Sequence, residues 1–380
     1  MKCSLIHKCG GCFFEDDDYQ KQLHYKTDLV KKEVEKQHIS LKVHDIQASP
    51  LEKGYRNKVI VAFNHRYEYG LYEESSRKVI PYHKCYLHEE IMDEILMFLQ
   101  KYFKKYRVSI YDPYKNKGLL RHVLIRRAVV TNQTMVVLVC NDRIWKGSKQ
   151  LCQQLTNRFS SIKTIVLNVN TRKTPVVLGQ EDKVLFGKGF IVDELCGLKF
   201  KISPQSFYQI NHDQCVALYT KALSLLKVNG KEHGIDAYCG IGTIGMILSK
   251  QIGHVIGVES NRNAVKDAIN NAKMNQLDRI HFICQDASDF MSELALKKEK
   301  IDIVIMDPPR SGSTKQFMDA VYQLRPQQVI YISCDPMTQI RDLLYFRKLG
   351  YQGNDMYLYD MFPHTKHVES IVRLCFKKSC

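Results

Sequence analysis

A cysteine follows directly on a strongly apolar run, in Val329-Ile-Tyr-Ile-Ser-Cys334-Asp-Pro336. The run predicts a strand and the proline predicts the start of a helix, so Cys334 lies in the connection between them. A thiol at a helix start gains thiolate character from the helix amides and can be partly exposed. A single cysteine ordinarily fills a core, but this position at the carboxyl edge of a sheet favours a nucleophile.

A second polar motif ends another apolar run, in Ile303-Val-Ile-Met-Asp-Pro-Pro-Arg310. The paired prolines stiffen the turn after Asp307, which suits a carboxylate that is held beside a reacting group. Enzymes that methylate amino groups carry an aromatic residue after Pro-Pro, whereas this chain carries Arg310. A cation there can stabilise negative charge that develops on a substrate oxygen. The structural alternative is a loop with an exposed ion pair.

Acid–base groups follow near the end of the chain, in Asp360-Met-Phe-Pro-His-Thr-Lys-His-Val-Glu369-Ser. His364, His367 and Glu369 have the chemistry of metal ligands or of proton carriers. Because no further ligand cluster lies close in the sequence, we expect a general base among these three residues and not a metal site.

A glycine-rich turn stands between a predicted strand and a predicted helix, in Asp236-Ala-Tyr-Cys-Gly-Ile-Gly-Thr-Ile-Gly245. Its glycines let the backbone approach a ligand, and Glu259 ends the next strand, where a carboxylate suits a ribose diol. The spacing Gly240-x-Gly242-x-x-Gly245 also fits a dinucleotide site. Asp236 before the turn favours S-adenosylmethionine, and a nicotinamide dehydrogenase stays the alternative.

Four cysteines have the spacing of a metal site, Cys3-x5-Cys9-Gly-Gly-Cys12 together with Cys85. The glycines allow the backbone to turn around a metal, and the spacing alone leaves zinc and [4Fe–4S] open. The other cysteines of this 13-cysteine chain are expected to be core or surface residues.

The charge is concentrated in the first half of the chain. The 380 residues carry a net charge of +16, and residues 1–205 hold 35 Lys and Arg against 22 Asp and Glu. Such an excess indicates a polyanionic partner. The composition, 44% hydrophobic and 25% charged, excludes a mainly disordered chain. No apolar stretch has the length of a membrane helix and no signal peptide is visible, so we expect a cytoplasmic protein, by default a monomer.

The elements that position these residues divide near residue 205. Residues 1–205 predict a basic, β-rich domain with strands near 55–63, 121–130, 134–140, 162–170 and 190–203 and helices near 19–37, 88–106 and 147–160. In residues 206–380, strands near 233–238, 254–258, 280–284, 301–306 and 328–333 alternate with helices. This alternation predicts a parallel, doubly wound sheet, and strands near 354–361 and 367–377 are expected to end it as an antiparallel pair.

Taken together, the motifs resemble the RNA (uracil-5-)-methyltransferase family, and within it the iron–sulfur enzymes that act on 23S ribosomal RNA. The resemblance covers nearly the whole chain and includes Ser206-Phe-Tyr-Gln209-Ile-Asn211 besides the motifs above. It implies a Rossmann-like, class I S-adenosylmethionine-dependent methyltransferase domain over residues 206–380. A β-rich domain with an iron–sulfur cluster and an RNA-binding surface would precede it over residues 1–205.

The resemblance also implies a role for each site residue. A [4Fe–4S] cluster would be held by Cys3, Cys9, Cys12 and Cys85. S-adenosylmethionine would be bound by Gln209, Tyr238, Gly240, Gly242, Thr243, Glu259, Asp286 and Asp307. Cys334 would attack uracil, Glu369 would be the general base, and Arg310 and Asp307 would assist. Two departures from the family are expected: the TRAM domain that some relatives carry before the cysteine cluster is not recognised, and Asp335 stands where Asn is common.

The implied reaction is formation of 5-methyluridine through a covalent bond between Cys334 and C6 of uracil. The target nucleotide would have to be flipped out of the folded RNA. Three other functions stay open: a tRNA (uracil-5-)-methyltransferase, an NAD-binding oxidoreductase, and an inactive RNA-binding protein.

Overall fold

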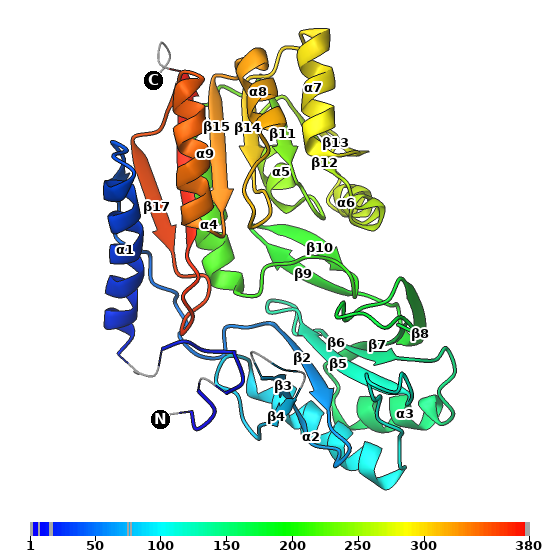
Figure 1. Ribbon diagram of the computed structural model, residues 1–380. Helices are drawn as coiled ribbons and strands as arrows, with labels where there is room; N and C mark the ends of the chain where they lie inside the picture. The colour runs from blue at the N-terminus through cyan, green and yellow to red at the C-terminus, as the bar shows by residue number, and fades with distance from the viewer. Residues whose placement is uncertain (1–2, 7, 15–17, 74–75, 77, 377–380) are drawn as a thin grey trace.

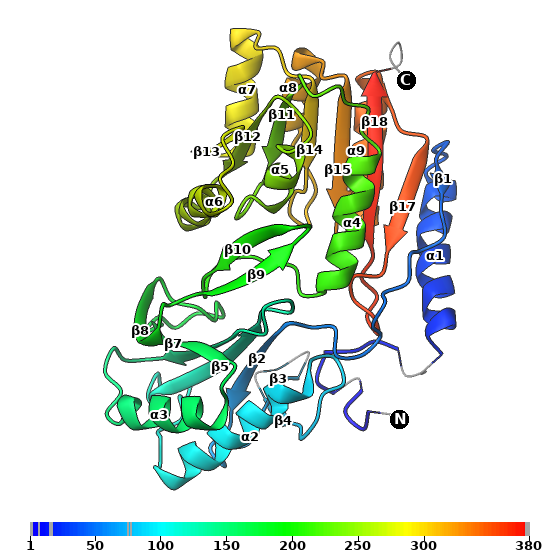
Figure 2. The same ribbon diagram turned by 180° about the vertical axis from the view of Figure 1, so that it is seen from behind.

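The computed structural model describes residues 3–6, 8–14, 18–73, 76 and 78–376. Figure 1 shows one β-sheet with its helices above a second one, and Figure 2 shows the same arrangement from behind. The first half contains α1 (Tyr19–Lys36), β1 (Lys42–Val43), β2 (Lys58–Phe63), β3 (Tyr69–Tyr72), β4 (Val79–Pro81), α2 (Glu90–Lys105), β5 (Leu120–Arg127), β6 (Thr134–Cys140), α3 (Ser148–Arg158), β7 (Ile162–Val169), β8 (Glu181–Gly187), β9 (Ile191–Leu195) and β10 (Leu198–Ile202).

The second half alternates helices and strands as its apolar pattern predicts. It contains α4 (His212–Ser224), β11 (His233–Ala237), α5 (Thr243–Leu248), β12 (His254–Glu259), α6 (Arg262–Met274), β13 (Ile280–Cys284), α7 (Ala287–Lys297), β14 (Ile303–Met306), α8 (Lys315–Leu324), β15 (Gln328–Ser333), α9 (Pro336–Lys348), β16 (Tyr351–Gln352), β17 (Asp355–Tyr359) and β18 (Glu369–Phe376). Residue 377, expected at the end of the last strand, lies outside the described residues.

These strands form a nine-stranded sheet within the described residues, in the order β1-β17-β18-β15-β14-β11-β12-β13, with β16 beside β18. The strands from β11 to β15 pair in parallel. β18 runs antiparallel to both β15 and β17. The predicted doubly wound sheet with an antiparallel end is therefore confirmed.

The central strands β14 and β15 bury both faces, because helices cover both. Ile303 and Ile305 of β14 face a core shared with α4, α5 and α6. Val304 and Met306 face the other core, shared with α7, α8 and α9. Figure 1 shows α7, α8 and α9 on the near side, and Figure 2 shows α4 on the opposite side. Burial on both faces explains why the strands are continuously apolar.

The described residues of the first half form a seven-stranded sheet in the order β4-β3-β2-β5-β6-β7-β8. Its pairs are antiparallel except β6 with β7. The segment expected as one strand at 190–203 is a hairpin of β9 and β10. Cys196 and Gly197, at φ of 51° and 73°, turn the chain between them. The elements β1, β3, β4, β8, α4 and β16 were not predicted.

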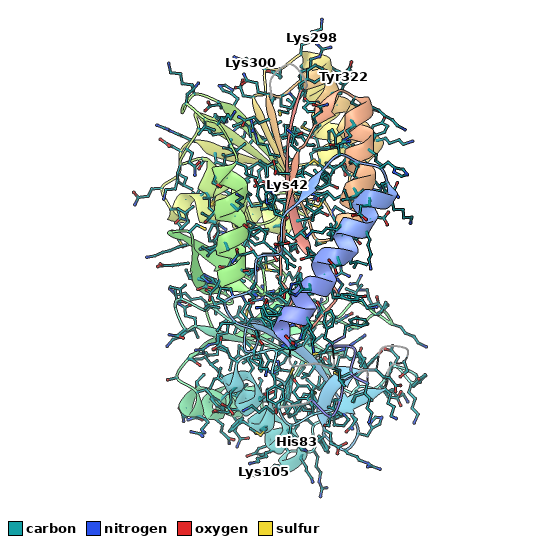
Figure 3. All side chains as sticks on the ribbon, turned by 90° about the vertical axis from the view of Figure 1, so that its left-hand side faces the viewer. Lys42, His83, Lys105, Lys298, Lys300 and Tyr322 are labelled. Carbon is teal, nitrogen blue, oxygen red and sulfur yellow. The ribbon has the colours of Figure 1, made fainter. Side chains whose placement is uncertain are left out.

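The first 50 residues reach across to the second half. β1 pairs in parallel with β17. On α1, Leu23, Val30 and Val34 pack into the core around α9 and β15. Figure 3 shows α1 extending along the molecule from the upper half toward the lower one. The domain boundary at residue 205 stays a prediction. Although these residues precede it in the sequence, they pack on the second half.

No helix in the described part of the chain is both long and apolar enough to cross a lipid bilayer.

Candidate active site

A cavity of about 590 Å³ opens where the strand order of the second-half sheet reverses, between β11 and β14. Ligands of doubly wound sheets bind at this place, outside the carboxyl ends of the strands. The volume lies in the range of small-molecule sites. Nine predicted site residues line this active-site cavity: Gln209, Tyr238, Gly240, Glu259, Asp286, Asp307, Arg310, Cys334 and Glu369.

Strand register brings the predicted nucleophile and general base together. Ser333, at the end of β15, is the antiparallel partner of Ser370 on β18. Cys334 follows Ser333 and Glu369 precedes Ser370, so both residues lie at the same end of this strand pair. Asp307 follows β14, the parallel neighbour of β15. Residues from three strand ends meet at one edge of the sheet.

Two buried carboxyl groups share the active-site cavity. The Glu369 residue is only 3% exposed. Burial, and then the nearby charge of Asp307, raise the pKa of Glu369 to about 8, although Arg310 opposes the shift. Burial also raises the pKa of Asp307 to about 7. Both groups are thus able to hold or release a proton near neutral pH.

The Cys334 thiol is half-buried and protonated in the free protein. Burial, followed by the charges of Glu369 and Asp307, raises its pKa to about 11, and Arg310 acts in the opposite direction. The Asp335 carboxylate, and not Cys334, accepts the amides of Met337 (3.0 Å) and Thr338 (3.2 Å) at the start of α9. The expectation that helix amides give Cys334 thiolate character is therefore wrong.

The glycine-rich turn after β11 adopts a backbone that side chains disfavour. Gly240 and Gly242 have φ of 56° and 84°. A Cβ on Gly245 would lie 2.7 Å from Asp236 Oδ2. That oxygen accepts the amide of Gly245 at 2.7 Å. The buried Asp236 carboxylate therefore braces the turn, and its pKa is raised by burial to about 7.

The predicted donor-site carboxylates lie at the next two strand ends. Glu259 accepts the amides of Gly240 (3.2 Å) and Asn261 (2.7 Å). Asp286 follows β13 and accepts the amides of Ser288 (2.8 Å) and Asp289 (3.2 Å) at the start of α7. Both residues also line the active-site cavity. Each therefore holds the local backbone and is placed to contact a ligand.

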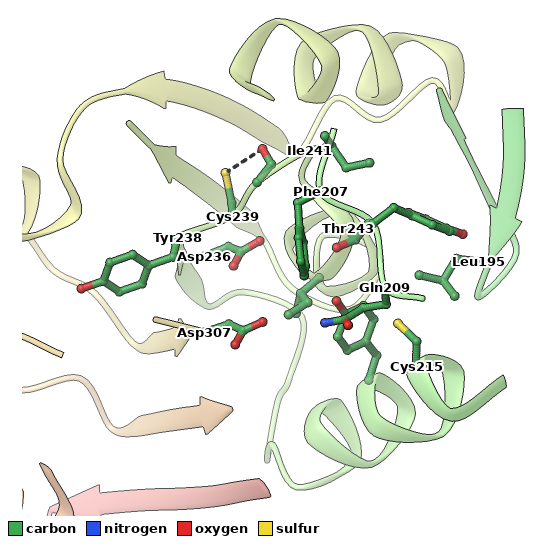
Figure 4. Close-up of a pocket in the computed structure, with 14 residues that line it drawn as sticks. Leu195, Phe207, Gln209, Cys215, Asp236, Tyr238, Cys239, Ile241, Thr243 and Asp307 are labelled. Atoms are coloured by element: carbon green, nitrogen blue, oxygen red, sulfur yellow. Dashed lines mark hydrogen bonds between the residues drawn. The ribbon is translucent and has the colours of Figure 1, made fainter. Parts of the chain in front are cut away.

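A smaller cavity of about 40 Å³ adjoins the active-site cavity and shares Phe207, Gln209, Tyr238, Gly240 and Asp307 with it. Figure 4 shows the Gln209 amide and the Asp307 carboxylate pointing into the space between them. Thr243 lines only this smaller cavity.

Gly242 lines neither cavity. A Cβ there would lie 2.6 Å from the Phe282 ring. Steric space therefore explains this glycine, and its contact with a methyl donor stays a prediction.

Two aromatic residues of the active-site cavity were not predicted as site residues. Phe207 is 66% exposed although it is large and apolar. Phe362 is half-buried and lies on the loop between β17 and β18. Both line the cavity. The signal that could have found them is an aromatic residue inside a polar loop motif.

The loop that carries Phe362 is fixed by α1. Lys26 Nζ lies 2.6 Å from Asp360 Oδ1, and neither side chain has any exposed surface. Lys26 also donates to the carbonyl of Phe362 at 3.2 Å. The Tyr19 hydroxyl donates to Asp360 Oδ2 at 2.9 Å. A buried network thus joins the start of the chain to the wall of the active-site cavity.

The four predicted metal ligands come together elsewhere. Cys3, Cys9, Cys12 and Cys85 line one cavity of about 60 Å³ with Leu71, Leu87 and Phe14. Among the described residues, however, no group of three or more His, Cys, Asp or Glu side chains is arranged to hold a metal ion. The structure brings the thiols to one place, and the [4Fe–4S] cluster stays a prediction.

Comparisons with known proteins agree with this site. The family model of tRNA (uracil-5-)-methyltransferase matches residues 18–377. An uncharacterized RNA methyltransferase of Clostridium tetani is 37% identical over 98% of this chain and 82% of its own length. One from Caldanaerobacter subterraneus is 35% identical over 97% and 82%.

A solved structure shows the same fold. The Pyrococcus abyssi tRNA (uracil-54, C5)-methyltransferase, in complex with S-adenosyl-L-homocysteine, has a TM-score of 0.79 and 28% identity over 94% of this chain and 83% of that one. Family membership decides against the dehydrogenase that the glycine spacing left open. The match along nearly the whole sequence shows that this chain belongs to the tRNA (uracil-5-)-methyltransferase family, a family of RNA methyltransferases.

Proposed function

We propose that the protein transfers a methyl group from S-adenosylmethionine to C5 of a uridine in 23S ribosomal RNA. The observation that carries the methyl transfer is the active-site cavity itself, which Cys334, Glu369 and Arg310 share with the donor-site residues Glu259 and Asp286. The choice of 23S ribosomal RNA rests on the resemblance of the cysteine pattern at the start of the chain. The first half, residues 1–205, would supply the RNA-binding surface and the second half, residues 206–380, the chemistry.

The donor fits the turn after β11 and the two following strand ends. Gly240 at positive φ has no side chain at the cavity wall, so a ligand can approach the backbone there, and Glu259 presents a carboxylate that suits ribose hydroxyls. The P. abyssi relative holds S-adenosyl-L-homocysteine, the product of the same donor. When bound, S-adenosylmethionine supplies an electrophilic methyl carbon. Gln209 and Asp307 would orient it from the shared wall of the two cavities.

The acceptor is activated by Cys334. Carbon 5 of uracil is a weak nucleophile, so the thiol first loses its proton to solvent, to which it is half open. Its sulfur then bonds to C6, and the electrons of the C5–C6 double bond move toward O4. Arg310 at the cavity would disperse that negative charge. The electrons at C5 then form the bond to the donor methyl carbon, whose bond to the sulfonium sulfur breaks, so that S-adenosyl-L-homocysteine would be left.

Glu369 completes the reaction as general base. It removes the proton from C5, the electrons re-form the C5–C6 double bond, and the bond from C6 to sulfur breaks. A carboxylate with a pKa raised to about 8 is a stronger base than an exposed one. Burial thus tunes Glu369 for this step.

Two substitutions test the scheme. Cys334→Ala should abolish methylation and leave the affinity for S-adenosylmethionine near that of the wild type. Glu369→Gln should accumulate a covalent protein–RNA adduct, which is resolved by denaturing electrophoresis. An active Glu369→Gln without adduct would contradict the assigned base.

A tRNA uridine is the second candidate substrate. The family model and the P. abyssi relative both carry tRNA in their names. Methylation of purified 23S ribosomal RNA and of bulk tRNA, followed by mass mapping of 5-methyluridine, distinguishes the two. If only tRNA is modified, the assignment to 23S ribosomal RNA is wrong, and the proposed methyl transfer to C5 of uridine stands.

We also propose a [4Fe–4S] cluster on Cys3, Cys9, Cys12 and Cys85. What supports it is the donor set: four thiols at one cavity with largely apolar walls. Protein purified without air should be brown and contain four iron and four acid-labile sulfide per chain by this assignment. Cys85→Ser should lower both contents, whereas a colourless zinc protein would refute it.

A further inference from the structure

Two cations lie side by side in the first half with no acid between them. Lys58 begins β2 and is the direct cross-strand partner of Arg126 on β5. Burial, and then the charge of Arg126, lower the pKa of Lys58 to about 8. Burial lowers the pKa of Arg126 to about 10, and the Tyr208 phenol is the group that opposes it. Like charges placed directly opposite in a sheet destabilise it, so this pair calls for an explanation.

Arg126 has a structural task, but Lys58 has none. The Arg126 Nη1 donates to the carbonyls of Ser206 (2.8 Å) and Ser203 (3.3 Å). Its Nε is buried and has no hydrogen-bond partner in the described part of the chain. Lys58 is half-buried. Within the described residues, its ammonium has neither a hydrogen bond nor an ion pair, and Arg126 is its one charged neighbour.

The pair lies against the wall of the active-site cavity. Arg126 holds Ser206, and Asn57 donates to the carbonyl of Gln209 at 2.9 Å. Between those two anchors stands Phe207, whose exposed ring lines the cavity. Arg126 therefore supports the loop that borders the cavity, and Lys58 lies beside Arg126 on the neighbouring strand.

The two side chains also face the catalytic half. Ile60 and Leu124, on the same face as Lys58 and Arg126, join the core shared with the second half. Val59 and Val61, on the opposite face, join the core under α2. Alternation along the strands therefore directs the cations toward the junction between the halves.

We infer that Lys58 binds a phosphate of the RNA backbone next to the nucleotide that enters the active-site cavity. Arg126, 2% exposed, adds its charge from behind Lys58 without touching the RNA. A phosphodiester is always anionic, so its charge attracts both cations and offsets the unfavourable free energy of their mutual repulsion. This inference rests on the proposed function, because it takes RNA as the substrate.

The charge distribution favours RNA over a free anion. The first half carries 35 Lys and Arg against 22 Asp and Glu, which suits a long polyanion and exceeds what one small ion needs. Free phosphate shares the chemistry of a backbone phosphate, so the experiment includes it.

The test is the salt dependence of RNA binding by the full chain. The dissociation constant for a 23S ribosomal RNA transcript is measured between 50 and 200 mM salt for the wild type, Lys58→Met, Lys58→Arg and a control. Losing one phosphate contact flattens the slope of log K against log salt by roughly 0.7–0.9. Over this fourfold increase in salt, the fold-loss of affinity should be roughly three times smaller for Lys58→Met than for the wild type. Lys58→Arg should keep the wild-type slope.

The matched control is Lys297→Met, the same substitution at an exposed residue at the end of α7. Figure 3 labels the adjacent Lys298 at the end of the molecule away from the first half. This control should keep the wild-type slope. Lys58→Met should keep the wild-type affinity for S-adenosylmethionine, which shows that it is folded.

Two results would overturn the inference. If Lys58→Met binds and methylates RNA with the wild-type slope, Lys58 contacts no phosphate, although the proposed function stands. If inorganic phosphate at constant ionic strength stabilises the wild type but not Lys58→Met, and their RNA slopes agree, the ligand is a free anion. A wild type that neither binds nor methylates any RNA would instead reject the proposed function together with this inference.

Discussion

The buried ion pair between Lys26 and Asp360 gives the sharpest stability prediction. The two groups are 2.6 Å apart and neither side chain has exposed surface. Lys26→Met removes the cation and leaves the Asp360 carboxylate with a hydrogen bond from the Tyr19 hydroxyl. Breaking one partner of a buried pair costs about 3–5 kcal/mol, because the remaining charge stays in a poorly solvating interior.

A control on the same helix isolates burial as the cause. Lys31 pairs with Asp45 at 3.1 Å, but their side chains are 42% and 92% exposed. Lys31→Met, the same chemical change, should therefore cost less than about 1 kcal/mol. Equilibrium urea denaturation, followed by circular dichroism, measures both variants. A loss below 1 kcal/mol for Lys26→Met would refute the reasoning.

The partner substitution carries an additional pH signature. Burial lowers the pKa of Lys26, and the Asp360 charge opposes that shift. In Asp360→Asn the opposing charge is gone, so the folded protein prefers neutral Lys26 while the unfolded chain keeps it protonated. The unfolded state then binds more protons, and the stability of Asp360→Asn relative to the wild type should rise from pH 7 to pH 10.

Three further predictions concern the active-site cavity. Gly245→Ala places a Cβ 2.7 Å from Asp236 Oδ2, so we expect a loss of about 1–3 kcal/mol by overpacking and weaker S-adenosylmethionine binding, measured by calorimetry; unchanged affinity would show that the turn adapts. Iodoacetamide should modify Cys334 faster with each pH unit up to about pH 11, the raised pKa of the thiol, and a plateau near pH 8 by mass spectrometry would contradict this. The buried Glu369 has a pKa raised to about 8, so its contribution to stability is complete below its unfolded pKa near 4 and is lost as the pH rises to about 8. Glu369→Gln does not titrate, so its stability relative to the wild type should rise between pH 5 and pH 8. Equal pH profiles of the two proteins would speak against a buried carboxyl.

Much of the second half was predictable, because its information is local. Continuous apolar runs predict buried parallel strands, and polar residues directly after such runs lie at the carboxyl edge of the sheet. Asp307, Glu259 and Cys334 were found in this way, and all three line the active-site cavity. Their catalytic and binding roles stay proposals.

What escaped prediction depends on partners far apart in the chain. Phe207 lines the cavity from a loop with no apolar periodicity. The short β1 has no strand pattern of its own and exists because β17 pairs with it. A two-residue strand is defined by its neighbour, which no local window contains.

The sequence by itself determined which residues can do chemistry and the order of the elements that carry them, since residue type and local periodicity are properties of the chain. Tertiary structure decided which of these groups meet and in what protonation state. The register of β15 against β18 brings Cys334 and Glu369 to the same end of the sheet, and burial raises the pKa of the Cys334 thiol and the Glu369 carboxyl. Register and desolvation both arise from contacts between segments that are far apart in the chain. For this reason the sequence alone predicted a thiolate at Cys334, whereas the structure has a protonated thiol and a Glu369 carboxyl of raised pKa.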